Sequence, residues 1–421
     1  MNVLVVGKGG REHTIAWRFK QSASVQQVYV APGNPGMSDV AECVDISEHD
    51  HEALIAFARD HEIALTFVGA EGPLLAGLVD DFKRAGLTVF GPSAEAALIE
   101  GSKSFAKDLM KKYNIPTAAY EVFHNYEAAL AYIHQQGAPI VLKADGLAAG
   151  KGVTVAMTID EAERALKSMM KDEQFGDAGK AVVIEAFLQG EEFSYMAFVN
   201  GSDVYPMVIA QDHKRAFDGD AGPNTGGMGA YSPVPHIATD VVDYAKQQIL
   251  QATADALVEE GRPFTGVLYA GLIATENGPK VIEFNARFGD PETQVVLPRL
   301  EGDFAQVLLA ILQGNTVEMN WSQDAYLGVV LAAKGYPGSY KKGQEITGCD
   351  ALQADTLLFH AGIKKQDSKL ITDGGRVLLV ACKAPTVLEA QRKVYREMQQ
   401  LTCEGSFYRT DIGNRAIGAL I

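Results

Sequence analysis

The residues of this chain best suited to chemistry lie at alternate positions in the apolar stretch 281–292. Side chains alternate between the two faces of a β-strand, so Glu283, Asn285 and Arg287 are predicted to share one face. The apolar side chains between and after them would take the other face and pack in a core: Ile282, Phe284 and Phe288. Polar groups on a buried strand cost free energy unless a partner satisfies them, so this face needs a ligand or a partner within the protein.

These three polar groups admit two interpretations. Carboxylate and carboxamide oxygens are hard ligands that suit Mg2+ or Mn2+, and a guanidinium suits a phosphate oxygen. Alternatively, Glu283 and Arg287 pair with each other in a structural salt bridge. Buried ion pairs are common outside active sites too, so the spacing alone favours neither interpretation.

The chain that must position these groups has 421 residues, more than one hydrophobic core usually supports, which predicts two to four domains. Its formal net charge of -16 argues against nucleic-acid binding, which would need a basic surface. We find no long uncharged apolar run and no signal peptide, so we expect no membrane association and a cytoplasmic location. Four scattered cysteines favour reduced, structural thiols over a zinc site or disulfides.

The first hundred residues alternate short apolar runs with helical patterns, which predicts a parallel, doubly wound sheet. The runs are residues 3–6, 28–30, 65–68 and 88–90, and the helical patterns are residues 51–60 and 74–84.

Two loops of this region follow strands, at the edge where ligands of such sheets bind. The loop 7–12 opens a helix, and its backbone amides could bind an anion. Glu12 stands where a dinucleotide site needs its third glycine, so a nicotinamide cofactor is not expected. In the loop 69–73, Glu71 could accept hydrogen bonds from sugar hydroxyls or favour the dipole of a helix start.

A glycine-rich loop, 144–152, joins two predicted strands in the middle of the chain. It is not a Walker phosphate loop, because Asp145 and Gly152 occupy two of the positions that the motif requires. Lys143, at the end of the first strand, would reach a phosphate as a point charge. The alternative is a flexible hairpin with solvated lysines, and the loop taken alone favours this second interpretation.

Weaker signals follow this hairpin. A turn after the strand 181–185 could read a purine edge, with Glu192 on the ribose hydroxyls. The turn-rich stretch 223–230 is predicted to be a long loop of a binding site. Residues 240–260 have the apolar stripe of a core helix.

Residues 326–421 read as a small α/β domain, with strands at 326–332 and 376–382 and a helix at 387–401. A packing role is favoured for this domain. Arg409 and Arg415 could bind an anion or cap helices, and the structural role is favoured for both.

The order of these features resembles the ATP-grasp fold, in which two α+β lobes clamp ATP. The features are Lys143, the glycine-rich loop, the turn at 185–188 with Glu192, and the Glu283-x-Asn285 strand. Three motifs are similar, more closely, to the phosphoribosylamine-glycine ligases (glycinamide ribonucleotide synthetases): residues 143–153, 223–233 and 287–294. The resemblance runs along the whole chain, and it favours the interpretation of metal and phosphate at the 281–292 stretch.

The resemblance implies a nucleotide site and assigns residues to it. Lys103 and Lys143 would contact the phosphates of ATP. Glu185 and Leu188 would lie at the adenine, and Glu192 at the ribose.

The resemblance also implies a metal site for Mg2+ or Mn2+. Glu283 and Asn285 would be its ligands, and Arg287 would act with Lys143 on the transferring phosphate. Many ATP-grasp proteins carry a third acidic ligand 13 residues before the glutamate, where this chain has Ala270. The metal would therefore have two protein ligands, with phosphate oxygens and water completing an octahedron.

The implied reaction joins glycine to 5-phosphoribosylamine through a glycyl phosphate, at the expense of ATP. Loop residues would hold the phosphoribosyl group: Gly9, Gly10, Arg11 and Glu71. Acidic residues would lie near the glycine and the amine: Asp212, Asp290 and Glu292. The loop 144–152 would act as a lid that excludes water from the acyl phosphate.

The resemblance implies three domains: an N-terminal domain 1–101 for the phosphoribosyl substrate, an ATP-grasp domain 102–325 with a lid lobe at about 120–190, and a C-terminal domain 326–421. We expect small-molecule substrates, no nucleic-acid or membrane partner, and a monomer. The alternative is another ATP-grasp ligase or carboxylase with a different acid or acceptor. A nucleotide-binding regulator without turnover is disfavoured, because sensing alone would not require the Glu283, Asn285 and Arg287 set.

Overall fold

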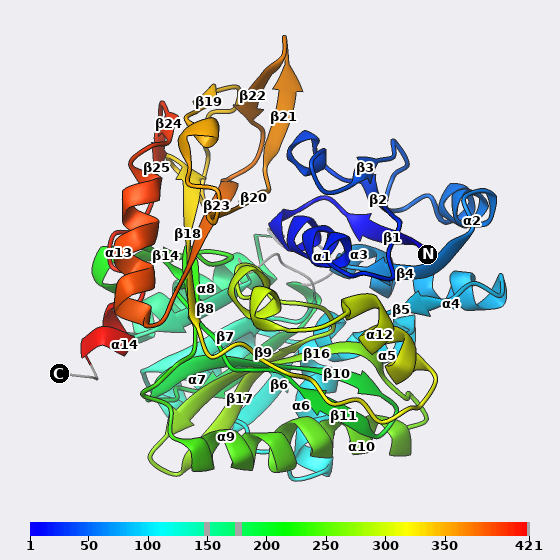
Figure 1. Cartoon of the computed structure of the whole chain (residues 1–421). Coiled ribbons are helices and arrows are strands. Elements are labelled where there is room, and N and C mark those ends of the chain that lie inside the picture. The colour runs from blue at the N-terminus through cyan, green and yellow to red at the C-terminus, as the bar shows by residue number, and fades with distance from the viewer. Residues whose placement is uncertain (147–151, 173–178, 419–421) are drawn as a thin grey trace.

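The computed structural model describes residues 1–146, 152–172 and 179–418 (Figure 1). Most of the predicted lid loop, residues 147–151, lies outside the described residues. No helix in the described part of the chain is long and apolar enough to cross a membrane.

The N-terminal part is a five-stranded parallel sheet in the order β3-β2-β1-β4-β5, which confirms the predicted doubly wound sheet. Its strands are β1 Asn2–Gly7, β2 Gln27–Pro32, β3 Glu42–Cys43, β4 Ile63–Val68 and β5 Val89–Phe90. Its helices are α1 Gly10–Lys20, α2 His51–Asp60, α3 Glu71–Leu75, α4 Leu78–Arg84 and α5 Ala94–Gly101. The single helix predicted at 74–84 is wrong, because Gly77, with φ of +84°, separates α3 from α4 in a left-handed conformation.

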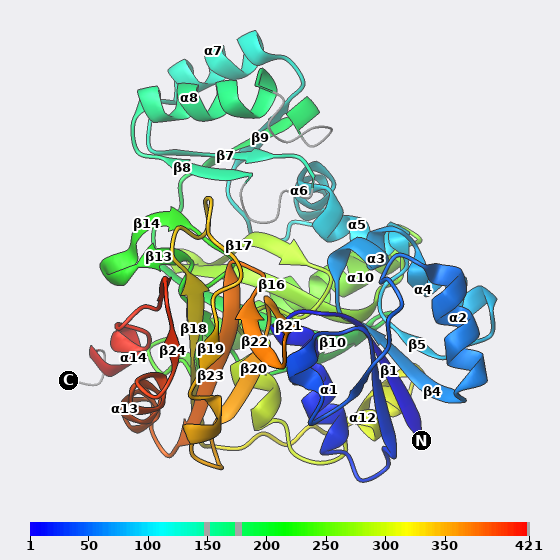
Figure 2. The same cartoon turned by 90° about the horizontal axis from the view of Figure 1, so that it is seen from above.

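A small antiparallel lobe follows, and Figure 2 shows it standing away from the rest of the molecule. Its sheet has the order β6-β9-β7-β8, and two helices cover one face and bury an apolar core of its own. The strands are β6 Tyr120–Phe123, β7 Ile140–Ala144, β8 Val153–Ala156 and β9 Val182–Ala186, and the helices are α7 Tyr126–Gln136 and α8 Ile159–Met170. Helix α6 Lys103–Lys112 precedes this lobe in the chain and packs against the body of the molecule.

The large lobe is built on the antiparallel sheet β11-β10-β16-β17. Its strands are β10 Glu191–Asn200, β11 Asp203–Pro206, β16 Thr265–Thr275 and β17 Gly278–Asn285. The predicted helix 240–260 is confirmed, with a π-helical segment in its middle: α9 Thr239–Ala245, η4 Lys246–Gln251 and α10 Ala252–Glu259. Helices α11 Thr293–Val296 and α12 Phe304–Leu312 follow β17.

Strand β17 contains a bulge that the period-two pattern did not predict. Val281 pairs with Leu272 of β16, whereas Glu283 pairs with Gly271, so Ile282 is the extra residue. Ile282 was predicted to face the core, but it lines the same pocket as Glu283. The strand ends at Asn285, and Arg287 therefore lies beyond it.

The C-terminal sheet has the order β12-β15-β18-β23-β20, and β25 also pairs with β18. Its strands are β12 Gln211–Asp212, β15 Gly229–Ser232, β18 Ala325–Ala333, β20 Leu357–His360, β23 Arg376–Ala384 and β25 Ser406–Phe407. Helix α13 Val387–Met398 packs on β18 and β23, and α14 Asn414–Gly418 follows (Figure 1). Smaller ribbons complete this part: β19 Ile346–Thr347 with β24 Thr402–Cys403, and β21 Ile363–Gln366 with β22 Lys369–Thr372.

The predicted long loop 223–230 is wrong. Strand β14 Ala221–Asn224 pairs with β13 Arg215–Phe217, and β15 begins at Gly229. Through β12 and β15, the segment 211–232 joins the C-terminal sheet. Hydrogen bonds between β15 and β18 therefore attach this segment to the later part of the chain.

Candidate active site

A pocket lies against the strands β10, β16 and β17 of the large-lobe sheet, and Glu283 lines it. The pocket also contains side chains from β10 and from the β12 segment: Glu192, Ser194, Asp212 and Lys214. Asn285 stands two residues beyond Glu283, on the same face of β17, where it pairs with Tyr269. The strand therefore places one carboxylate and one carboxamide together, as the sequence pattern required.

The donor set at this edge suits a hard divalent cation. Among the described residues, no group of three or more His, Cys, Asp or Glu side chains could hold a metal ion by itself. Ala270 is fully buried opposite Phe284, on the core side of the sheet, so its position does not face the pocket. Glu283 and Asn285 thus fit a cation whose remaining ligands come from phosphate and water.

A buried group of three charges joins the small lobe to the body. Glu185 of β9 accepts a hydrogen bond from Lys107 of α6 at 2.8 Å and pairs with Lys143 of β7 at 2.9 Å. Lys143 also donates to the carbonyl of Ile282, beside Glu283, at 2.8 Å. Both carboxylate oxygens of Glu185 therefore face ammonium groups, and Lys143 links them to the β17 edge.

Burial and charge act in opposite directions on this group. Burial alone would raise the pKa of Glu185, but Lys143 and Lys107 lower it below its ordinary value. Burial lowers the pKa of Lys107 to about 8, although Glu185 opposes the shift. Lys107 was not predicted as a site residue, because a lysine inside a helix reads as a surface residue in the sequence.

Lys103 begins α6 and lies close to the end of the glycine-rich loop. Its ammonium donates to the carbonyl of Gly146 at 2.8 Å, and its backbone N–H donates to the carboxylate of Asp145 at 2.7 Å. Burial lowers the pKa of Lys103, and Glu283 opposes this shift. Leu188 is half-buried in the connection from β9 to β10, and Glu192 is the second residue of β10.

Arg11 and Arg287 share the carboxylate of Glu71. The Glu71 oxygen lies 3.3 Å from Nε of Arg287 and 3.6 Å from Nη2 of Arg11. Arg287 also pairs with Glu100 at 2.8 Å, so its ion pairs within the described chain are with Glu71 and Glu100 and not with Glu283. Burial would raise the pKa of Glu71, but Arg287 and Arg11 lower it to about 2.

Glu12 fills the space inside the first glycine loop. Its carboxylate accepts from the N–H of Gly9 at 2.7 Å and from Nε of Arg11 at 2.7 Å. A Cβ at Gly7 would lie 2.5 Å from Glu12 Cγ, and the φ of Gly7 is +133°, so a side chain does not fit there. The loop is closed around an internal carboxylate, with Gly10 beside Gln294.

Two acidic residues of the predicted substrate set have different surroundings. Asp212 pairs with Lys214 at 3.0 Å at the pocket. Glu292 is buried and accepts from the Tyr269 hydroxyl at 2.5 Å and from Ser194 at 3.0 Å. Burial raises the pKa of Glu292, and the charge of Asp212 raises it further. Lys214 was not predicted as a site residue. The only feature of the sequence that could have indicated it is its position two residues after Asp212.

Asp290, the third acidic residue, is held from two sides. One carboxylate oxygen accepts from Gln294 at 2.9 Å, and the other lies 3.3 Å from the guanidinium of Arg376, on the C-terminal sheet. Burial would raise the pKa of Asp290, but Arg376 and Arg11 lower it. Arg376 was also missed, because nothing in the sequence links β23 to this loop.

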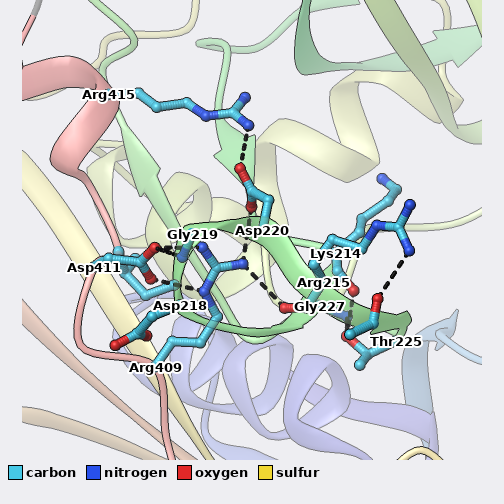
Figure 3. A network of polar contacts seen from close by, with 12 residues as sticks. Lys214, Arg215, Asp218, Gly219, Asp220, Thr225, Gly227, Arg409, Asp411 and Arg415 are labelled. Carbon is cyan, nitrogen blue, oxygen red and sulfur yellow. Dashed lines mark hydrogen bonds and ion pairs between the residues drawn. The ribbon is translucent and has the colours of Figure 1, made fainter.

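Arg409 and Arg415 form structural ion pairs, as favoured from the sequence. Arg409 pairs with Asp220 at 3.0 Å and with Asp411 at 2.7 Å. Figure 3 shows its guanidinium between these two carboxylates. Arg415 pairs with Asp220 at 2.5 Å and with Glu191 at 3.1 Å. These contacts tie the end of the chain to the β13–β14 hairpin and to the start of β10.

Three family models match consecutive parts of the chain. They are the N domain, the ATP-grasp (A) domain and the C domain of phosphoribosylglycinamide synthetase, over residues 1–100, 101–293 and 326–415. A phosphoribosylamine-glycine ligase of Halalkalibacterium halodurans is 62% identical over 99% of this chain and 97% of its own length.

Solved structures give the same picture. The crystal structure of a phosphoribosylamine-glycine ligase from Thermotoga maritima matches with a TM-score of 0.86 and 35% identity, over 98% of this chain and 100% of that one. A biotin carboxylase domain of 2-oxoglutarate carboxylase from Hydrogenobacter thermophilus, in complex with ADP and magnesium, matches with a TM-score of 0.73 at 15% identity, over 100% of this chain and 98% of that one. This second match shows a shared fold.

Proposed function

This chain belongs to the phosphoribosylglycinamide synthetase family, and from that premise we propose how its residues divide the work of the reaction. The chain is an ATP-dependent ligase that joins glycine to 5-phosphoribosylamine through a glycyl phosphate, giving glycinamide ribonucleotide, ADP and phosphate. The full-length match at 62% identity is the observation that carries this function.

The first step must turn the carboxylate of glycine into an electrophile. A carboxylate repels an incoming amine, whereas a phosphorylated carboxyl has lost that charge and gained a leaving group. Phosphoryl transfer depends mainly on positioning and on neutralising charge. The protein therefore needs cations around the triphosphate and a surface that holds glycine beside it.

We assign the nucleotide to the Lys143 side of the site. Lys143 and Lys103 contact the phosphates, and the segment from Glu185 to Leu188 lies at the adenine, with Glu192 at the ribose. The carboxylate of Glu185 is already satisfied by two lysines, so its part is to orient Lys143 and Lys107. Glu283 and Asn285 would hold a divalent cation, Mg2+ or Mn2+, which supplies charge neutralisation at the phosphates when bound.

We assign the phosphoribosyl group to the Arg11 side of the site. Gly9, Gly10, Arg11 and Glu71 line this side, and Arg287 lies between it and the β17 edge, where its guanidinium would meet the transferring phosphate. Asp212, Asp290 and Glu292 would hold glycine and the amine. The shared carboxylate of Glu71 supports this assignment, because it brings Arg11 and Arg287 together.

The remaining proposals concern the whole chain. We propose domains at 1–101, 102–325, with a lid lobe at about 120–190, and 326–421. We also propose a cytoplasmic monomer that acts on small molecules and binds neither nucleic acid nor membranes.

Phosphate release, measured with ATP, glycine and 5-phosphoribosylamine and with each omitted in turn, tests the function. Glycine labelled with heavy oxygen in its carboxyl group reports the chemistry, because the acyl phosphate route carries one labelled oxygen into phosphate. We expect phosphate release that requires all three substrates, and labelled phosphate. Release that does not require the sugar amine would favour another acceptor, and unlabelled phosphate would exclude the glycyl phosphate.

A further inference from the structure

Arg376 reaches from the C-terminal sheet into two loops beside the proposed substrate site. It is the first residue of β23, where its backbone pairs with Ala332 of β18. Its guanidinium donates to the carbonyls of Asp290 at 2.6 Å and Gly226 at 3.0 Å, and it pairs with the Asp290 carboxylate at 3.3 Å. One planar group thus fixes three acceptors, which a lysine could not do with the same geometry.

The two loops held by Arg376 also pack directly on each other. A Cβ at Gly227, where φ is +115°, would lie 2.3 Å from Cδ of Pro291, so these loops touch without room for a side chain. Tyr336, which follows β18, accepts a hydrogen bond from the N–H of Gly226 at 3.0 Å. The C-terminal part therefore fixes both loops from one side with two polar side chains.

Asp290 carries this arrangement to the N-terminal loop. A Cβ added at Gly9 would lie 3.9 Å from the carboxylate oxygen of Asp290, and Arg11 contributes to the low pKa of the group. A Cβ added at Gly10 would lie 3.0 Å from Gln294, which donates to Asp290. Asp290 thus lies between Arg376 of β23 and the loop assigned to the phosphoribosyl group.

We propose that Arg376 is a positioning residue for 5-phosphoribosylamine, acting through Asp290, which it holds against the Gly9 loop. The inference rests on the proposed function, because it takes its substrate from there. The C-terminal part would then help to bind 5-phosphoribosylamine, in addition to the packing role expected from the sequence. Asp290 is assigned to glycine as well as to the amine, whereas the nucleotide is assigned to the Lys143 side of the site, so ATP binding is expected not to depend on Arg376.

Steady-state kinetics of Arg376→Ala and Arg376→Lys, with each substrate varied in turn, test the proposal. The matched control is Lys383→Ala, which removes a cation from the same strand and breaks an ion pair with Asp324, away from the site. For Arg376→Ala we expect kcat/KM for 5-phosphoribosylamine to fall by about 10-fold to 100-fold, the range for losing a hydrogen-bonded charge. The KM for ATP should change by less than about 2-fold.

Chemical rescue separates positioning from general stability. Millimolar guanidinium should restore part of the lost kcat/KM in Arg376→Ala and leave Lys383→Ala unchanged. Arg376→Lys should lose less than Arg376→Ala, because it keeps the charge and loses the planar fork. If Arg376→Ala does not fold, Arg376→Lys decides, since a lower kcat/KM for 5-phosphoribosylamine with an unchanged KM for ATP supports the proposal.

Two results would overturn the inference: an unchanged kcat/KM for 5-phosphoribosylamine, or an equal loss for ATP and the amine that guanidinium does not rescue. Failure of the proposed function looks different. In that case the parent protein itself would show no phosphate release that depends on 5-phosphoribosylamine, whereas failure of the inference alone leaves the parent fully active.

Discussion

Replacing Glu185 by glutamine should cost the protein a large part of its stability. The carboxylate faces two ammonium groups at 2.8 and 2.9 Å, and the side chains of all three residues are at most 4% exposed. Glutamine keeps the shape and removes the charge, so Lys107 and Lys143 would be buried without a counter-charge. Breaking a buried ion pair in this way costs about 3–5 kcal/mol.

Equilibrium unfolding in urea, followed by circular dichroism, measures this loss. Since whole domains are stable by about 5–15 kcal/mol, the expected change is a large shift of the midpoint. The control is Glu345→Gln, which breaks the exposed pair with Lys369, also 2.8 Å long, and should cost about 0–1 kcal/mol. Adding Lys107→Met to Glu185→Gln should restore part of the stability, because one buried ammonium remains instead of two.

A loss of stability no larger than that of Glu345→Gln would show that the buried ion pairs of Glu185 contribute no more than an exposed pair. It would mean that the two lysines find water or lose their protons at little cost, and that the three charges do not hold the small lobe to the body. If Glu185→Gln loses the expected stability but keeps the KM for ATP, the ion pairs of Glu185 stabilise the fold. That result would contradict the proposal that Glu185 orients Lys143 toward ATP.

Three further predictions concern single residues. Lys143→Ala should raise the KM for ATP, because it removes a cation from the phosphates, and an unchanged KM would contradict that contact. Glu283→Ala should abolish glycine-dependent ADP release and weaken Mn2+ binding in titrations with ATP, and near-normal release would exclude its assigned role. The pKa of Glu71 is lowered to about 2 in the folded protein and is about 4.5 in the unfolded chain, so its ion pairs stabilise the fold above pH 4.5 and are lost as the pH falls toward 2. In acid titrations of unfolding, the difference between the parent and Glu71→Gln should therefore shrink from pH 4.5 to pH 2, and a constant difference would contradict the pairing with Arg11 and Arg287.

Local sequence patterns predicted most of the elements, because alternation and helical spacing depend on neighbours along the chain. The helix predicted at 51–60 coincides with α2, and the apolar runs of the first hundred residues are the strands of one parallel sheet. The bulge at Ile282 could not be predicted, since it depends on which residue of β16 lies opposite. Strand β15 escaped prediction because its partner β18 begins only at Ala325, and β12 because it pairs with β15 alone.

Within the site, the sequence indicated single residues better than their partners. The spacing of Glu283 and Asn285 placed both on one face, and the structure agrees. The partners of Asp290 and Glu185 were not predictable in the same way: Arg376 is 86 residues from Asp290, and Lys107 is 78 residues from Glu185. Such pairs arise from the packing of separate elements, which no local pattern records.

A crystal grown with Mn2+ and a non-hydrolysable ATP analogue would show whether Glu283 and Asn285 hold a divalent cation at the phosphates of ATP. The anomalous signal of manganese distinguishes the ion from water and from lighter ions. We predict a peak within coordination distance of the Glu283 carboxylate and the Asn285 amide oxygen, with the triphosphate beside Lys143. A manganese peak elsewhere, or a triphosphate bound away from this edge of β17, would contradict the account.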